Sequence, residues 1–316
     1  MPVNAAFRSV ATIAAVALAY FATAQVGLVL ALVGGQVTPL WLPTGISVAA
    51  LFLFGGRIAP GIALGALAAN VTLNGLGPAI LITAGNTAAP LAAWYLLTRC
   101  GFRTELDRLR DAVLLVFVGA FGAMLVSALV GAFALRIFGV IRWHEVAAVF
   151  SVWWTGDAMG VLVFTPLLLT FPRTWRAPGV RALEAAAILV ATAGLSLFVT
   201  TSQARFLFLV FPMLIWAALR FQHAVAAPCA VIISVAAVLS AASGSFAESG
   251  LLTTMIVLQA FNGSVALTGL ILSAITSERN QARQAIERAC EQLAETVTRY
   301  QEEGVRKRLG RVVPPA

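Results

Sequence analysis

Long apolar segments, each ended by glycine, proline or arginine, follow one another over the first 275 residues, and this repetition limits the folds available to the chain. A helix that crosses the hydrocarbon core needs about 20 mostly apolar residues, and shorter helices occur where protein encloses them. The pattern predicts an all-α, polytopic integral membrane helix bundle. Its ten candidate segments are Phe7–Val33, Trp41–Phe54, Ala59–Leu73, Ala79–Thr98, Ala112–Phe138, Val146–Phe171, Ala182–Thr200, Phe206–Leu219, Ala224–Ser243 and Leu251–Ile275.

The composition supports a membrane protein and argues against a nucleic-acid-binding protein. Of 316 residues, 60% are hydrophobic and 11% are charged, whereas a soluble domain is roughly 45–50% apolar and ~25% charged. The net charge is +8, of which residues 1–277 supply +6 (13 basic, 7 acidic) and residues 278–316 supply +2 (8 basic, 6 acidic). The arginines stand between apolar runs, which favours a role in membrane topology. The lipid bilayer is therefore the first expected partner, with no nucleic acid.

The arginine positions predict the orientation of the chain. A cytoplasmic N-terminus leaves ten arginines of the membrane region on the cytoplasmic side and three outside, in agreement with the positive-inside rule. The inside set is Arg8, Arg57, Arg99, Arg103, Arg108, Arg110, Arg173, Arg176, Arg181 and Arg220, and the outside set is Arg136, Arg142 and Arg205. Both termini are then cytoplasmic. The second, third and eighth segments are short, so eight full spans with a re-entrant hairpin are the alternative to ten.

A change in composition after Ile275 predicts a cytoplasmic C-terminal helix. Apolar or small residues recur there in steps of four and three, at Ala282, Ile286, Ala289, Leu293, Thr296 and Tyr300. This heptad seam favours a parallel two-stranded coiled coil, and hence a homodimer, over a single solvated helix. Gly304, Gly310 and the final prolines are expected to break the helix. The predicted domains are a membrane domain at 1–277, the helix at 278–303 and a flexible tail at 304–316.

Asp157 is the most informative single residue, because it lies in the middle of an apolar span. An acid at that depth costs about 2.5–3.5 kcal/mol on insertion scales and is usually functional. Trp153 and Trp154 share or flank its helix face, while Gly156 and Gly160 form a small-xxx-small pair that lets another helix approach. Asp157 is either a ligand-binding or sensing group or a structural acid that fixes helix packing.

Other polar residues in the spans are candidate partners of Asp157 in one polar cavity, although membrane amides more often cross-link helices. They are Gln25, Asn70, Asn86, Thr87, Gln259 and Asn262. Residues 41–70 form a second dense stretch, in which Gly61 and Gly65 predict close helix packing, with or without a binding site. The candidate sensing residues are Asp157, Trp154, Trp153, Asn86, Trp41, Asn70 and Gln259.

The sequence predicts no metal site, no cofactor and no enzyme activity. His144 and His223 are the only histidines, and the predicted topology places them on opposite membrane faces. The three cysteines, Cys100, Cys229 and Cys290, share no close spacing that would indicate a metal cluster. The sequence contains neither a glycine-rich phosphate loop nor a catalytic dyad that we can identify.

Several short motifs together resemble the bacterial membrane-associated sensor domain family of the first type. They are Trp-Leu-Pro-Thr-Gly at 41–45, Gly-Arg-x-x-Pro-Gly at 56–61 with Gly65 and Asn70, Gly-Asn-Thr at 85–87, and Trp154 with Asp157 through Gly160 to Pro166. Further matches are Phe-Pro at 211–212 with Trp216 and Arg220, Ser-Gly-Ser-Phe at 243–246, and the segment 268–283. The resemblance extends over about residues 7–285.

The resemblance implies a multi-pass sensory domain of the bacterial inner (plasma) membrane, usually described with eight spans. Such domains usually precede a histidine kinase of a two-component system, a diguanylate cyclase or a similar output. No phosphoacceptor-histidine helix, ATP-binding region or GGDEF-type sequence follows residue 300, so a stand-alone or truncated sensor is expected. The expected function is signal relay through the last span and C-terminal helix to a cytoplasmic output domain or partner. A small-molecule transporter or permease and a structural membrane subunit are the alternatives.

Overall fold

The computed structural model describes residues 2–29, 38–174, 180–201, 206–242 and 251–312, which are helical apart from short connections. The α-helices are α1 (Pro2–Val29), α2 (Leu42–Phe54), α3 (Ala59–Asn74), α4 (Leu76–Arg99), α5 (Leu109–Leu114), α6 (Leu125–Ile137), α7 (Val146–Thr174), α8 (Val180–Thr201), α9 (Phe211–Phe221), α10 (His223–Ala242) and α11 (Leu251–Val312). A π-helical stretch, Leu115–Gly122, joins α5 to α6, and 3-10 turns occupy Gly56–Ile58, Trp143–Glu145 and Leu207–Val210.

The helices match the ten expected apolar segments. Eight helical stretches of the described residues are long and apolar enough to cross a membrane, and α2 and the 3-10/α9 stretch Leu207–Phe221 are two shorter apolar helices. At 1.5 Å per residue α2 is about 20 Å long, less than a hydrocarbon core of ~30 Å. The third segment is not short, because the 3-10 turn extends α3 into a stretch of 18 residues, Gly56–Leu73.

Proline and glycine set the limits of the short helices. Pro43 lies in the first turn of α2, where its missing N–H is tolerated. Gly55 ends α2 with φ +80°, and Gly75 separates α3 from α4 with φ +74°. Both conformations lie in the left-handed region that favours glycine. These breaks allow α2, α3 and α4 to reverse direction through very short connections.

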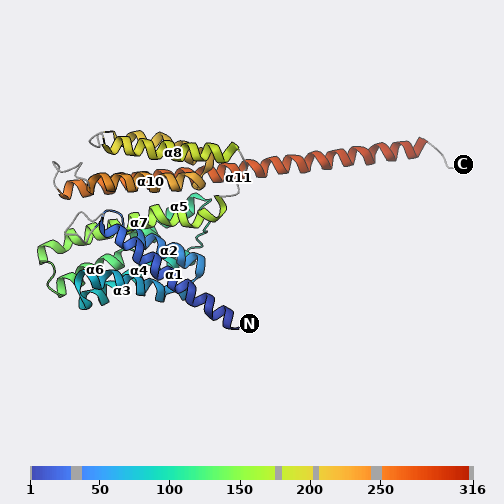
Figure 1. The fold of residues 1–316 in the computed structure, drawn as a ribbon. Coiled ribbons are helices and arrows are strands. Elements are labelled where there is room, and N and C mark those ends of the chain that lie inside the picture. The colour runs from blue at the N-terminus through green and yellow to red at the C-terminus, as the bar shows by residue number, and fades with distance from the viewer. Residues whose placement is uncertain (1, 30–37, 175–179, 202–205, 243–250, 313–316) are drawn as a thin grey trace.

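The bundle has two parts that meet along α7. Helices α1 to α6 pack with α7 in one part, while α8 to α11 form a layer on its other side, where α10 and α11 contact α7 (Figure 1). Apolar side chains fill the interior of both parts, and other large apolar side chains point outward, among them Phe117 and Leu183, which are 66% and 73% exposed. Outward-facing apolar side chains are expected where lipid surrounds a helix bundle.

The helix α11 extends beyond the bundle and differs from the sequence expectation at its end. It continues through Gly304 and Gly310 to Val312 as one helix of 62 residues, so the expected break at Gly304 is wrong. An isolated glycine costs about 1 kcal/mol in a helix, and the neighbouring arginine, lysine and leucine residues are good helix formers. Residues 313–316, with the final prolines, lie outside the described residues, as do 30–33, 175–179 and the motif at 243–246.

The N-terminus and the projecting part of α11 lie at the same end of the bundle (Figure 1). This arrangement requires an even number of crossings, as expected for termini on one side of the membrane. We predict that this side is the cytoplasm. With the native cysteines replaced by serine, Thr104→Cys in the loop after α4 should resist an impermeant thiol reagent added to intact cells. Val140→Cys, exposed in the loop after α6 at the other end, should react with it. The reverse labelling pattern would invert the topology.

Candidate functional site

The start of α2 lies directly against the backbone of α7. A Cβ added at Gly160 would overlap the carbonyl oxygen of Trp41, and one at Gly156 would lie 2.6 Å from the carbonyl oxygen of Thr38. A Cβ at Gly45 would in turn overlap the carbonyl oxygen of Gly160. The Trp41 N–H donates a hydrogen bond of 3.0 Å to the Gly156 carbonyl. The small-xxx-small pair of α7 therefore accommodates the extended chain that leads into α2.

This close approach surrounds Asp157 with hydroxyl groups from two other helices. Asp157 is 1% exposed. The Thr44 hydroxyl of α2 donates a hydrogen bond of 2.6 Å to one carboxyl oxygen, and the Ser127 hydroxyl of α6 donates to the other. The Trp153 side chain, one turn earlier on α7, also lies near the carboxyl. Asp157 thus joins α2, α6 and α7 at one buried point.

A second group of polar side chains adjoins Asp157 from α1 and α4. The Asn86 amide of α4 donates a hydrogen bond of 3.2 Å to the Tyr20 hydroxyl of α1, which is itself buried. Trp41 and Asp157 also lie close enough to Tyr20 to act on its hydroxyl. We call these seven residues the Asp157 cluster: Tyr20, Trp41, Thr44, Asn86, Ser127, Trp153 and Asp157.

Trp154 connects α7, the helix that carries Asp157, to the π-helical stretch. Its indole N–H donates a hydrogen bond of 2.8 Å to the carbonyl oxygen of Phe121, and the two rings meet edge to face with centroids 5.6 Å apart. The Phe150 ring stacks on the Trp154 ring, with centroids 6.1 Å apart. A π-helix leaves backbone groups without their usual α-helical partners and is often found at functional sites. Trp154 supplies one such carbonyl with a donor.

The chemistry of the cluster is that of a buried acid that accepts hydrogen bonds from neutral groups. Among the described residues, no arginine, lysine or histidine forms an ion pair with Asp157. The Asn86 side-chain oxygen, another acceptor of the cluster, is buried without a hydrogen-bond partner. Such a site can change its protonation state or bind a cationic or hydrogen-bond-donating group. The hydroxyl donors would reorganise in either case.

The structure does not bring all the predicted polar residues together. Asn70 donates a hydrogen bond to the Ala66 carbonyl of its own helix. Gln259 and Asn262 lie on α11 in the other part of the bundle, where the Gln259 amide nitrogen and both polar atoms of Asn262 are buried without partners. Asn70 is thus satisfied within its own helix, and a polar cavity that joins Gln259 and Asn262 to Asp157 stays a prediction.

The predicted packing glycines of α3 lie against α1. A Cβ added at Gly61 would be 2.5 Å from the Ile13 carbonyl oxygen, and one at Gly65 would be 2.7 Å from the Ala17 carbonyl oxygen. The same Gly65 position would contact the Tyr20 side chain at 2.7 Å. Close contact between α1 and α3 thus fixes the helix turn that carries Tyr20 into the Asp157 cluster.

Sequence reasoning missed Tyr20, Thr44 and Ser127. The hydroxyl groups of these residues complete the cluster, yet they lie in apolar runs that resemble ordinary spans. One available signal was Thr44 within the Trp-Leu-Pro-Thr-Gly motif. Tyr20 was another, because a buried tyrosine hydroxyl usually finds a hydrogen-bond partner.

A second polar contact region lies where α11 leaves the bundle. The side chain of Glu278 accepts a hydrogen bond of 3.1 Å from the Leu109 N–H, the first residue of α5. The Gln281 amide donates a hydrogen bond of 2.8 Å to Asp107. Glu278 therefore supplies an acceptor, and a favourable negative charge, to the N-terminus of α5. We call these four residues the loop–α11 junction.

Asp111 and His223 hold the loop before α5 in place. Asp111 is buried, accepts two hydrogen bonds from the Arg108 guanidinium at 2.8 and 2.9 Å, and accepts one from the Arg103 N–H. The His223 ring, at the start of α10, hydrogen-bonds with the Leu106 carbonyl at 2.8 Å. The loop is thus tied to α5, α10 and α11, and forms a defined base for the projecting helix.

Comparison with known proteins agrees with these features. The family model of the MASE1 domain (membrane-associated sensor domain 1) matches residues 12–280, which include the Asp157 cluster and Glu278. Neither the search of curated proteins nor the search of solved structures finds a match. MASE1 is a family of membrane sensory domains without catalytic activity of their own. Because the matched region covers most of the chain, this protein belongs to the MASE1 family.

Proposed function

We propose that the Asp157 cluster is the sensing site of this protein and that its state is relayed through α11 to a cytoplasmic output domain or partner. Asp157, Trp153, Trp154, Trp41 and Asn86 are the proposed sensing residues, with Tyr20, Thr44 and Ser127 as additional members. A stimulus that protonates Asp157, or binds to it, would change the hydrogen bonds that join α2, α6 and α7. The multi-pass domain would lie in the bacterial inner membrane with both termini in the cytoplasm.

One observation carries this proposal: a single membrane segment joins the cluster to the loop–α11 junction. The segment Leu109–Ile137 consists of α5, the π-helical stretch and α6. Its first N–H donates to Glu278 on α11, and Ser127, farther along, donates to Asp157. A shift of this segment caused by a change at Asp157 would therefore act on α11 where it leaves the bundle.

The π-helical stretch lies between these two contacts and is the element expected to change. Its Phe121 carbonyl depends on the Trp154 indole of α7, and Ser127 is only six residues away. Return of this stretch to α-helical geometry would rotate α5 relative to α6, since the number of residues per turn would change. Such a change would move the Leu109 N–H relative to the Glu278 side chain that accepts its hydrogen bond.

The projecting part of α11 is suited to pair with a second copy of the chain. Residues 278–301 are exposed along the whole helix, and the seam includes Ile286, Leu293 and Tyr300, which are 65%, 66% and 71% exposed. A parallel coiled coil would bury this seam and turn a rotation of α11 into a signal for an output domain or partner protein. The proposed assembly is a homodimer through this helix.

Disulfide crosslinking in membranes tests the relay. In a chain with its native cysteines replaced by serine, we expect Leu293→Cys on the seam to crosslink at least threefold faster than Glu291→Cys beside it. Asp157→Asn should change the Leu293→Cys rate severalfold. The double variant Glu278→Ala/Gln281→Ala should abolish that change, because it removes the two side chains of α11 whose hydrogen bonds define the junction.

The matched control for the junction is Glu295→Ala, an exposed residue farther along α11. It should leave the effect of Asp157→Asn on the crosslinking rate intact. Equal crosslinking at 291 and 293 would contradict the dimer seam. A full Asp157→Asn effect that persists in the Glu278→Ala/Gln281→Ala variant would contradict the relay through the junction.

A further inference from the structure

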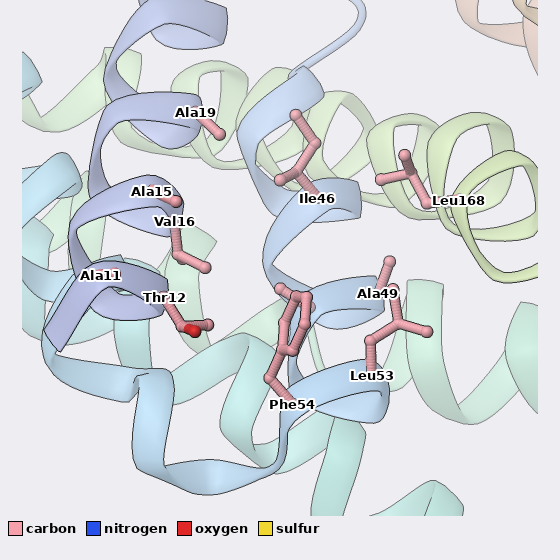
Figure 2. Close-up of a pocket in the computed structure, with 11 residues that line it drawn as sticks. Ala11, Thr12, Ala15, Val16, Ala19, Ile46, Ala49, Leu53, Phe54 and Leu168 are labelled. Atoms are coloured by element: carbon pink, nitrogen blue, oxygen red, sulfur yellow. The ribbon is translucent and has the colours of Figure 1, made fainter. Parts of the chain in front are cut away.

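An apolar groove lies between α1 and α2 on the side of the bundle. It has a volume of about 420 Å³, and Leu168 of α7 lines it on the side of α2 away from α1 (Figure 2). Figure 2 shows small side chains of α1 facing the larger side chains of α2 across it. The main lining residues are Ala11, Ala15 and Ala19 from α1 and Ile46, Ala49 and Phe54 from α2.

The lining gives the groove an apolar character suited to hydrocarbon. Thr12 is its only hydroxyl-bearing residue, and the Thr12 hydroxyl already donates a hydrogen bond of 2.8 Å to the Arg8 carbonyl. Ala15, Leu53 and Phe54 are exposed, so the hollow opens to the side, where the membrane lies. Spread along the length of α2, about 20 Å, this volume leaves a groove much narrower than the diameter of a helix, about 10–12 Å. A slender flexible chain fits it better than another helix does.

Two arginines lie at one end of the groove. Arg8 is one turn before Thr12 on the same face of α1, and Arg57 follows Phe54 on the turn after α2. The Arg57 Nε donates a hydrogen bond of 3.1 Å to the Phe54 carbonyl, which holds the guanidinium beside the end of the groove. Ile58, the next residue, packs in one cluster with Val16 of α1. The turn that carries Arg57 is therefore next to α1.

The part of the sequence that contains these two arginines has no acidic residue to offset their charge. Residues 1–104 contain no aspartate or glutamate, and Glu105 is the first acid of the chain. Among the described residues, neither Arg8 nor Arg57 forms an ion pair, and both are exposed. Two unpaired guanidinium groups at the predicted cytoplasmic interface attract anionic headgroups. Arginine also binds phosphate oxygens well, through paired N–H donors.

We propose that this groove is a binding site for an anionic phospholipid, with an acyl chain along α1 and α2 and its phosphate between Arg8 and Arg57. The apolar hollow corresponds to the acyl chain of a phospholipid, and the two arginines at its end correspond to the phosphate of the headgroup. The site is separate from the Asp157 cluster and does not depend on the proposed relay. Because α2 also carries Thr44, a lipid in this groove contacts the helix that donates to Asp157.

Native mass spectrometry of the full chain in detergent tests this site, with dioleoyl-phosphatidylglycerol and dioleoyl-phosphatidylcholine as the probes. We expect the anionic lipid to bind at least fivefold more tightly. Arg8→Gln and Arg57→Gln should each weaken its binding about fivefold, from about 1 kcal/mol per arginine near an anionic surface. The matched control is Arg99→Gln, an exposed arginine at the end of α4 that lies 5.1 Å from the Tyr95 ring, and its effect should be below twofold.

Filling the hollow tests the place of the acyl chain. Ala15→Leu should weaken binding of both lipids by a similar factor and leave their ratio unchanged, and Ala11→Leu serves if the first variant does not fold. Equal affinity for the two lipids, or equal effects of the Arg8→Gln/Arg57→Gln double variant and Arg99→Gln, would overturn the proposal. A loss of self-association in Ala15→Leu with unchanged lipid binding would also overturn it, because the occupant would then be a second copy of the chain.

Discussion

Asp157→Ala is expected to lower the free energy of unfolding in detergent by about 2 kcal/mol, which corresponds to roughly 4–8 °C in the unfolding midpoint. The substitution leaves the hydroxyls of Thr44 and Ser127 buried without their acceptor. A hydrogen bond to a charged group is worth about 1.5–3 kcal/mol. Part of this loss is offset because a carboxyl no longer has to be buried. Thermal unfolding of the purified chain measures the difference.

Asp157→Asn should separate a sensing role from a purely structural one. The amide has nearly the same shape, can accept from one hydroxyl and can donate to the other, so stability should stay within about 1 kcal/mol of the parent. A sensing acid would nevertheless be held in its neutral form by this change, and α11 crosslinking should shift. Asn70→Ala is the polar control, because the hydrogen bond that the Asn70 amide donates is to the Ala66 carbonyl of its own helix. An Asp157→Ala variant as stable as Asn70→Ala, with unchanged crosslinking, would exclude both roles.

The spans could be predicted from sequence because hydrocarbon thickness and apolar run length determine them. The second segment, for example, was predicted at Trp41–Phe54 and forms α2 at Leu42–Phe54. Its partner could not be predicted in the same way. The contact of α2 with α7 depends on where the chain crosses Gly156 and Gly160, and a small-xxx-small pair does not specify which segment lies against it.

The hydrogen-bond partners of hydroxyl and amide side chains in the spans could not be predicted from the sequence either. Ser47 donates to the Pro43 carbonyl of its own helix, whereas Thr44, three residues earlier, donates to Asp157. Asn70 and Asn86 differ likewise, since one bonds to its own backbone and the other to Tyr20. A membrane helix offers backbone carbonyls to every such side chain. Sequence therefore locates polar side chains in spans but does not distinguish self-satisfied residues from those that join helices.

Gly160→Ala is expected to have the largest effect of any conservative substitution proposed for this chain, about 3 kcal/mol or roughly 6–12 °C. The added methyl group would occupy the position of the Trp41 carbonyl oxygen, and backbone cannot move aside as a flexible side chain can. Separating α2 from α7 would also lengthen the hydrogen bond of 3.1 Å that Thr165 donates to the Gly45 carbonyl. The Thr44–Asp157 contact would be lost with it, so stability and sensing should fail together.

Gly194→Ala is the matched control, because Gly194 also lies in a membrane helix, but an added Cβ there would meet no packing neighbour within 4 Å among the described residues. Alanine favours a helix by about 1 kcal/mol over glycine, so this variant should equal or exceed the parent in thermal stability. Unfolding of both variants in the same detergent, followed by size-exclusion chromatography, gives the comparison. If Gly160→Ala unfolds at the same temperature as Gly194→Ala, then α2 does not lie against α7 as described. The Asp157 cluster would then lack the helix contact on which its hydroxyl donors depend.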